Sequence, residues 1–223
     1  MPLLGFCHEG FAQAVTLTAR ISWSGPRHQA RVVVWLASAE PASADFAAPK
    51  EHPRLIQKNK TFIPHLLVVP VGSVVEFPNH DPFFHNVFSL FEGKRFDLGL
   101  YEAGTTRDVH FDKAGVSYIF CNIHSEMSAV VIAVPTPYYA ISDAQGELLL
   151  TSVPPGSYLM HVWYEGLAPE DLERLAHPIT VTENMSSLGV LRLKSPGTLR
   201  AHKNKYGRDY VPPTPDSPGY GQH

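Results

Sequence analysis

The chain has 223 residues, of which 44% are hydrophobic and 17% are charged, so it can fold around one large core or two modest ones and is not a disordered chain. Its net charge of -3 and the lack of a Lys/Arg cluster in the sequence argue against a general nucleic-acid binder. The sequence has no apolar run near the roughly 20 residues that a membrane-spanning helix needs.

The N-terminal stretch MPLLGFCHEGFAQA ends in an Ala-Gln-Ala pattern of the kind that signal peptidase reads. We therefore expect residues 1–14 to be the remnant of a signal peptide, and the protein to be periplasmic or otherwise exported. Cys7 would leave with this segment, and Cys121 would then have no partner for an intramolecular disulfide. A lone thiol in an oxidising compartment needs protection, which a bound metal provides.

Strand patterns begin directly after this segment. Residues 15–23, VTLTARISW, alternate as a half-buried strand does, and residues 30–38, ARVVVWLAS, have the continuous apolar run of a buried strand. Residues 39–60 are rich in Ala, Pro and charge, and we predict an inserted loop there. The stretch TFIPHLLVVPVGSVVEFPN then predicts two strands around a turn at residues 71–73, and further strands follow up to SAVVIAV at residues 128–134.

About eight short strands with frequent turns and no intervening helix predict an all-β fold, with a Greek-key β-sandwich over residues 15–134. After Pro135-Thr136-Pro137, the turns DAQGE and VPPGSY punctuate a second series of strands, which predicts a smaller β-sandwich over residues 138–194. The stretch APEDLERLAH within it predicts one short helix. Residues 195–223 lack apolar periodicity and are predicted to be a solvated tail, with a docking peptide as the alternative.

The segment FCNIHSEM carries three metal-ligand side chains in a short space, Cys121, His124 and Met127. A tight loop between strands can bring these three together, but a fourth ligand must come from elsewhere. The best candidate is His85, in VEFPNHDPFFHNVFS, at the start of another predicted strand. Two imidazoles, one thiolate and a weak thioether are the ligands of a blue-copper centre. Zinc sites seldom use Met, and an iron–sulfur cluster needs more cysteines.

This pattern resembles the cupredoxins. Two residues separate Cys121 from His124 and two separate His124 from Met127, which is most similar to the ligand loop of amicyanin, and His85-Asn86-Val87 matches the family's H-N-V at the first ligand. The resemblance implies that His85, Cys121, His124 and Met127 bind one type 1 copper ion, with Met127 as the weak axial ligand. It also implies that Asn86 connects the two ligand segments by hydrogen bonds.

The resemblance extends along most of the chain. QKNKTFIPHLLVVPVGSVVEFPN, RFDLGLY and TPYY are similar to exported bacterial proteins, some labelled methylamine-utilisation proteins, that join a cupredoxin-like domain to a carboxypeptidase-regulatory-like β-sandwich. For residues 138–194 this implies a transthyretin-like or carboxypeptidase-regulatory-like fold. The chain departs from amicyanin at Ser125-Glu126, where that family has Pro-Phe. A carboxylate at Glu126 should favour Cu(II) and lower the reduction potential.

These features predict an exported copper protein that carries single electrons between redox partners, such as a cytochrome or a periplasmic oxidoreductase. We expect His124 to be the electron port, and we expect no enzyme activity because all four ligand positions are filled. Two alternatives remain: a copper-binding protein for storage, delivery or sensing, and a docking β-sandwich protein without a redox role. His65 and His80 are predicted to be surface or turn residues, and Asp81 to be a turn residue that bonds its own backbone.

Overall fold

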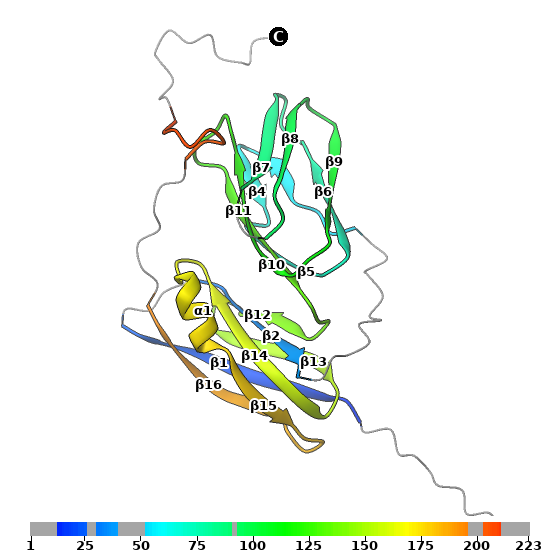
Figure 1. Ribbon diagram of the computed structural model, residues 1–223, viewed down its shortest axis with the longest axis vertical. Coiled ribbons are helices and arrows are strands. Elements are labelled where there is room, and N and C mark those ends of the chain that lie inside the picture. The colour runs from blue at the N-terminus through cyan, green and yellow to red at the C-terminus, as the bar shows by residue number, and fades with distance from the viewer. Residues whose placement is uncertain (1–12, 26–29, 40–51, 91–92, 196–202, 211–223) are drawn as a thin grey trace, which may run out of the picture. The chain divides into compact units, whose positions relative to one another are not determined.

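The computed structural model describes residues 13–25, 30–39, 52–90, 93–195 and 203–210 (Figure 1). Within these residues the chain forms strands β1 to β16 and one helix, α1, so the predicted all-β fold class is confirmed. Cys7, nearly all of the predicted signal-peptide remnant and residues 40–51 of the predicted inserted loop lie outside the described residues. Helix α1 has only seven residues, and the described residues contain no helix long and apolar enough to cross a membrane.

The strands fall into two separate units. The first unit contains β1, β2 and β12 to β16, and the second contains β3 to β11 together with residues 203–210. The second unit is therefore inserted between two consecutive strands of the first, since the chain leaves the first unit after β2 and returns at β12.

The first unit is a sandwich of two sheets with helix α1 (Pro169–Leu175) beside them. One sheet has the order β13-β1-β16, with β13 (Glu147–Val153), β1 (Val15–Ser24) and β16 (Ser187–Lys194). The other has the order β12-β2-β14-β15, with β12 (Tyr139–Ile141), β2 (Val32–Ser38), β14 (Gly156–Tyr164) and β15 (His177–Val181). Leu17 and Leu150 of the first sheet pack with Leu36 and Val162 of the second in one buried core.

The structure differs from the predicted domain boundary at residue 15. We expected residues 15–38 to belong to the copper domain, but β1 pairs with β13 and β16, and β2 pairs with β12 and β14. The alternation of residues along β1 correctly predicts a half-buried strand, but it cannot identify a partner more than 100 residues away. The predicted short helix in APEDLERLAH is confirmed as α1.

The second unit is also built around two facing sheets. Its larger sheet has the order β5-β11-β10-β7-β8, with β5 (Leu66–Pro70), β11 (Ser128–Val134), β10 (Gly115–Cys121), β7 (His85–Ser89) and β8 (Phe96–Tyr101). The opposite layer contains β6 (Ser73–Pro78) paired with β9 (Thr106–Phe111). Val75 and Phe77 of β6 pack with Val87, Ile119 and Val131 of the larger sheet in one buried core. The chain passes from one sheet to the other several times, so residues far apart in sequence meet at one end of the sandwich.

Part of the predicted inserted loop is structured. Strand β3 (Ile56–Lys58) forms a hairpin with β4 (Thr61–Ile63), and Leu55 is fully buried. The backbone N–H of Leu55 donates to the carbonyl of Glu76 on β6 at 2.8 Å, which fixes this segment to the sandwich. The sequence predicts a loop here because a three-residue strand between Pro53 and a Lys-Asn-Lys turn is too short to show a periodic pattern.

A chain shortened to residues 15–137 is expected to aggregate. It keeps the apolar strands β1 and β2 but loses all of the strands with which they pair, which leaves unpaired strand edges exposed. Residues 52–137 are the matched control, because they contain β3 to β11 without the two unpaired strands. Size-exclusion chromatography should show mainly large species for the first fragment and a larger monomeric fraction for the second. Equal monomer fractions would contradict the strand assignment.

Candidate metal centre

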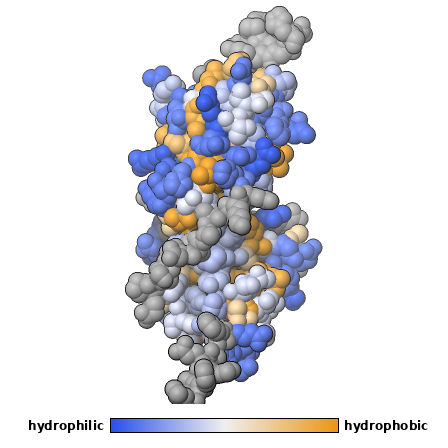
Figure 2. Space-filling view, turned by 90° about the vertical axis from the view of Figure 1, so that its right-hand side faces the viewer, coloured by the Kyte–Doolittle hydropathy of each residue, from blue (hydrophilic) through white to orange (hydrophobic). Residues whose placement is uncertain are grey.

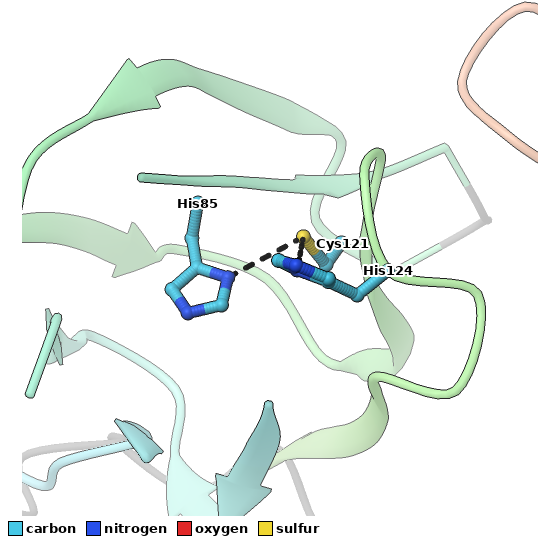
Figure 3. Close-up of side chains that lie close together, drawn as sticks. All are labelled: His85, Cys121 and His124. Carbon is cyan, nitrogen blue, oxygen red and sulfur yellow. Dashed lines mark hydrogen bonds between the residues drawn. The ribbon is translucent and has the colours of Figure 1, made fainter. Parts of the chain in front are cut away.

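The structure brings three of the four predicted ligands together in the second unit (Figure 3). The Sγ atom of Cys121 lies 3.6 Å from Nδ1 of His85 and 3.6 Å from Nδ1 of His124. The ligand atoms of all three side chains lie within 4.8 Å of one another, so the group could hold a metal ion. His85 and Cys121 are fully buried, and His124 is half-buried.

Two neighbouring strands position this group. β7 begins at His85, β10 ends at Cys121, and the two strands pair antiparallel with Cys121 opposite Val87, so both side chains lie at the same end of the sheet. Cys121–Met127 is named here the ligand loop. It is closed by backbone hydrogen bonds from Met127 N–H to the His124 carbonyl at 3.1 Å and from Cys121 N–H to the Met127 carbonyl at 3.2 Å.

Met127 is fully buried and belongs to the same core cluster as Cys121. Its backbone bonds hold it at the end of the ligand loop, where the chain enters β11. Its role as the weak fourth ligand remains a prediction from the sequence.

A buried carboxylate that the sequence analysis did not assign to the site lies behind His85. Oδ2 of Asp81 lies 2.9 Å from Nε2 of His85, and the two side chains are 4% and 0% exposed. The Asp81 carboxylate can only accept a hydrogen bond, so Nε2 of His85 is the donor and carries the ring proton. The other ring nitrogen, Nδ1, then has a lone pair that faces Cys121. This arrangement leaves Nδ1 free to bind a metal.

The prediction that Asp81 bonds its own backbone is wrong. Its carboxylate accepts hydrogen bonds from the backbone N–H groups of Asn59 at 2.6 Å and Lys60 at 2.9 Å, as well as from His85. The local turn is made instead by Asn79, whose Oδ1 accepts from the Asp81 N–H at 3.0 Å. The four-residue separation of Asp81 from His85 was the available sequence signal, but it is not specific enough without the fold.

Both imidazoles are held in the neutral form that binds metal. Burial lowers the pKa of His85, although its hydrogen bond to Asp81 works in the opposite direction. Burial and the like charges of His85 and Lys60 lower the pKa of His124 to about 4. Burial alone would raise the pKa of Asp81, but its hydrogen bonds from Lys60 and His85 bring it below the usual value, so Asp81 stays ionised.

Asn86 connects the two ligand segments differently from the expectation. Its backbone carbonyl accepts a hydrogen bond from the Asn122 N–H at 3.0 Å, which joins β7 to the ligand loop. Its side-chain amide donates instead to Oδ1 of Asp97 at 2.7 Å. The predicted connection therefore exists through the backbone, while the side chain extends the network to β8.

An aromatic side chain covers the two histidines. The ring of Phe83 lies 5.3 Å from that of His85 and 5.6 Å from that of His124, and the two imidazoles are 5.0 Å apart, centroid to centroid. Such packing restricts the imidazoles to few orientations. His65 and His80 are exposed, as predicted, and neither belongs to the group that the structure brings together.

The donor set fits copper. A fully buried cysteine and two neutral imidazoles combine one soft ligand with two ligands that suit both Cu(I) and Cu(II). Three such donors also suit zinc, but a thioether at the fourth position, as the sequence predicts for Met127, favours copper.

The stability of the metal-free protein is expected to fall as the pH is lowered from 6.5 towards 4. The pKa of His124 falls from its ordinary value of 6.5 to about 4 in the fold, so between these values the unfolded chain binds the proton and the folded chain does not. Protonation then favours unfolding. Urea denaturation of the metal-free protein at several pH values measures this slope. His124→Gln should flatten it more than His80→Gln, the exposed control, and equal slopes would contradict the prediction.

No family model and no curated protein matches this chain. Among solved structures it is similar to a copper-containing nitrite reductase from Thermus scotoductus, with 23% identity over 40% of this chain and a TM-score of 0.37; the match spans about a quarter of the reductase, 23%. It is also similar to a purple cupredoxin from Nitrosopumilus maritimus, with 23% identity over 37% of this chain and 99% of that one and a TM-score of 0.34. A third is amicyanin from Paracoccus versutus, with 20% identity over 45% and 97% and a TM-score of 0.35. With TM-scores below 0.5, these likenesses do not assign a function to this chain.

Proposed function

We propose that this protein is a type 1 copper protein that carries single electrons between redox partners. The observation that supports this most is the buried Cys121 sulfur, which lies 3.6 Å from Nδ1 of each of two neutral imidazoles. His85, Cys121 and His124 would hold the ion, with Met127 as a weak fourth ligand. When bound there, copper would supply a one-electron couple between Cu(I) and Cu(II).

The surrounding protein fits this role because it holds the ligands in one arrangement. His85 and Cys121 lie on paired strands, Asp81 orients the His85 ring, and backbone hydrogen bonds close the ligand loop. A site that is fixed in this way would change little between the two oxidation states. Low reorganisation favours fast electron transfer over catalysis at the ion, so we propose a carrier rather than an enzyme.

His124 is the proposed electron port. It is half-buried, whereas His85 and Cys121 are fully buried, so it is the ligand that a partner can approach. Its chain neighbour Ile123 is 45% exposed, and Phe84, the neighbour of His85, is 46% exposed. On the face of the molecule in Figure 2, hydrophobic areas lie between hydrophilic ones. Exposed apolar side chains next in sequence to the proposed ligands suit brief contact with a cytochrome or another periplasmic redox protein.

The first unit is proposed to be a spacer or docking module of the carboxypeptidase-regulatory-like type. It has its own core, and the described residues place no second group of metal ligands in it. Export to the periplasm is proposed from the sequence at residues 1–14 and from the unpaired Cys121, which a bound copper ion would protect.

Redox cycling of the copper-loaded protein tests this function. The protein should accept an electron from ascorbate and return it to ferricyanide over repeated cycles, without losing copper, and should give a reversible one-electron wave in voltammetry. A colourless protein that binds only Cu(I) would overturn electron transfer in favour of copper storage or delivery. A folded protein that binds no copper would leave only the docking role.

Replacing Glu126 with glutamine is expected to raise the reduction potential slightly. Glu126 is exposed on the ligand loop, so its negative charge stabilises Cu(II) only through solvent. An exposed charge pair contributes up to about 1 kcal/mol, which for one electron corresponds to at most about 40 mV. Voltammetry at low salt measures the shift, and Glu102→Gln, an exposed residue outside the ligand loop, is the control. An unchanged or lower potential would contradict the prediction.

A further inference from the structure

The second unit includes a segment from the predicted tail. Residues 203–210 do not behave as a solvated tail, because they form three side-chain or backbone bonds to the ligand loop and to Asp97 of β8. This segment is named here the clamp segment. The described part of the tail therefore corresponds to the docking-peptide alternative of the sequence analysis, with the docking site on the same chain.

Tyr210 contacts the ligand residue that is central to the site. Its hydroxyl donates a hydrogen bond of 2.7 Å to the carbonyl oxygen of Cys121, and the ring is half-buried. Burial raises the pKa of Tyr210 to about 12, so the hydroxyl stays protonated and remains a donor. The carbonyl of Cys121 lies at the point where β10 ends and the ligand loop begins, so this bond fixes the start of the loop.

Lys205 joins the ligand loop to the strand next to His85. Its backbone N–H donates to Oδ1 of Asn122 at 3.0 Å, and its ammonium group pairs with Oδ2 of Asp97 at 2.8 Å. Oδ1 of Asp97 accepts from the side-chain amide of Asn86 at 2.7 Å. A continuous network therefore runs from Asn122, beside one ligand, through Lys205 and Asp97 to Asn86, beside the other.

The clamp segment has an ordered turn of its own. Oδ1 of Asn204 accepts from the backbone N–H groups of Tyr206 at 3.0 Å and Arg208 at 3.1 Å, and the Asn204 N–H donates to the Arg208 carbonyl at 2.9 Å. This turn spans residues 204–208, so it contains Lys205 and directly precedes the last two residues of the clamp segment. It sets the spacing at which Lys205 and Tyr210 reach the ligand loop.

We propose that the clamp segment is part of the metal centre, with Tyr210 and Lys205 as positioning residues that hold the ligand loop in its metal-binding arrangement. This inference rests on the proposed function for its effect on copper, but not for its effect on the loop itself. In the metal-free protein the clamp keeps Cys121 buried between the two imidazoles. In the loaded protein it restrains the loop that carries three of the four proposed ligands.

The test uses the full-length chain with single substitutions at Tyr210 and Lys205. Tyr210→Phe removes the hydroxyl and keeps the ring. Lys205→Met removes the ion pair with Asp97 and the cation–π contact with Tyr206. Tyr164→Phe is the matched control for the first, because the Tyr164 hydroxyl also donates to a distant backbone carbonyl, that of Lys194, at 2.9 Å in the first unit. Lys94→Met is the control for the second, because Lys94 forms a similar ion pair with Asp112 at 3.0 Å.

The first readout needs no metal: the rate at which iodoacetamide modifies Cys121 in the metal-free protein, followed by peptide mass spectrometry so that Cys7 is counted separately. Tyr210→Phe and Lys205→Met should each raise this rate several-fold, up to about tenfold, since each loses one hydrogen bond or ion pair. The second readout is Cu(I) affinity by competition, together with the energy of the thiolate-to-copper band. Tyr210→Phe should weaken copper binding about tenfold, as is typical for residues that orient metal ligands.

The clamp proposal is overturned if both variants protect the Cys121 thiol and bind copper as well as the unchanged protein does. The proposal is also overturned if the control variants change Cys121 modification and copper affinity as much as Tyr210→Phe and Lys205→Met do. These changes would then reflect a general loss of stability. If the unchanged protein binds no copper but the variants still expose Cys121 faster than the controls, the clamp stands and the proposed function fails.

Discussion

Cys121→Ser is expected to abolish the intense visible band of the copper-loaded protein and to weaken Cu(I) binding by more than about 100-fold, beyond the range for residues that only orient ligands. The band requires a thiolate bound to Cu(II), and Cys121 supplies the only sulfur among the three grouped ligands. A serine hydroxyl is a hard, neutral ligand that Cu(I) does not prefer. Absorption spectroscopy and Cu(I) competition measure the two effects.

One control variant and one further measurement isolate the cause of this loss. Cys7→Ser is the same chemical change at a residue outside the described part of the chain, and it should leave both the band and the affinity unchanged. Circular dichroism of metal-free Cys121→Ser should show the all-β fold, since the substitution removes little volume from the core. A band that persists in a folded Cys121→Ser protein would contradict the assignment of the ligand.

Asp81→Asn is expected to weaken copper binding by about 10- to 100-fold and to destabilise the metal-free protein by about 1–3 kcal/mol. The Asp81 carboxylate accepts three hydrogen bonds, from Asn59, Lys60 and His85. An amide of the same shape must present its NH2 group to at least one of these donors. With its oxygen towards Lys60 and His85, the amide would turn its NH2 group towards the Asn59 N–H, which loses its acceptor. The His85 ring would keep only a neutral acceptor, which holds the proton on Nε2 less strongly than a carboxylate does.

Asp143→Asn is the matched control for this change. Asp143 also accepts two backbone hydrogen bonds, from Gln145 at 2.9 Å and Glu147 at 2.8 Å, but it is exposed and lies in the first unit. Its replacement should leave copper affinity unchanged. Urea denaturation and Cu(I) competition measure both variants, and an Asp81→Asn protein with normal copper affinity would contradict the role of Asp81.

The sequence predicts which three side chains lie together because its information is local. The Cys-x-x-His-x-x-Met spacing lies within one loop, and the structure confirms that His85, Cys121 and His124 lie together at one end of a sheet. His85 could be chosen among twelve histidines because of its strand context and the Asn86 that follows it. The position of Met127 as the fourth ligand stays a prediction.

The sequence does not predict contacts that depend on distant partners. The pattern of β1 indicates a strand in either unit, and only its pairing with β13 and β16 decides which. Asp81 has the sequence context of an ordinary turn residue. Its main hydrogen-bond partners, at residues 59, 60 and 85, come together only in the fold, so the sequence does not indicate them. Tyr210 and Lys205 dock through polar groups, which leave no apolar periodicity in the sequence.

The most direct test of the central claim is the visible absorption and EPR spectrum of the full-length protein after one equivalent of Cu(II) is added. A type 1 site predicts an intense thiolate-to-copper band and a narrow copper hyperfine splitting. A weak absorption with the wide splitting of an ordinary Cu(II) complex, or no bound copper in a folded protein, would contradict the proposal that His85, Cys121 and His124 form an electron-transfer centre.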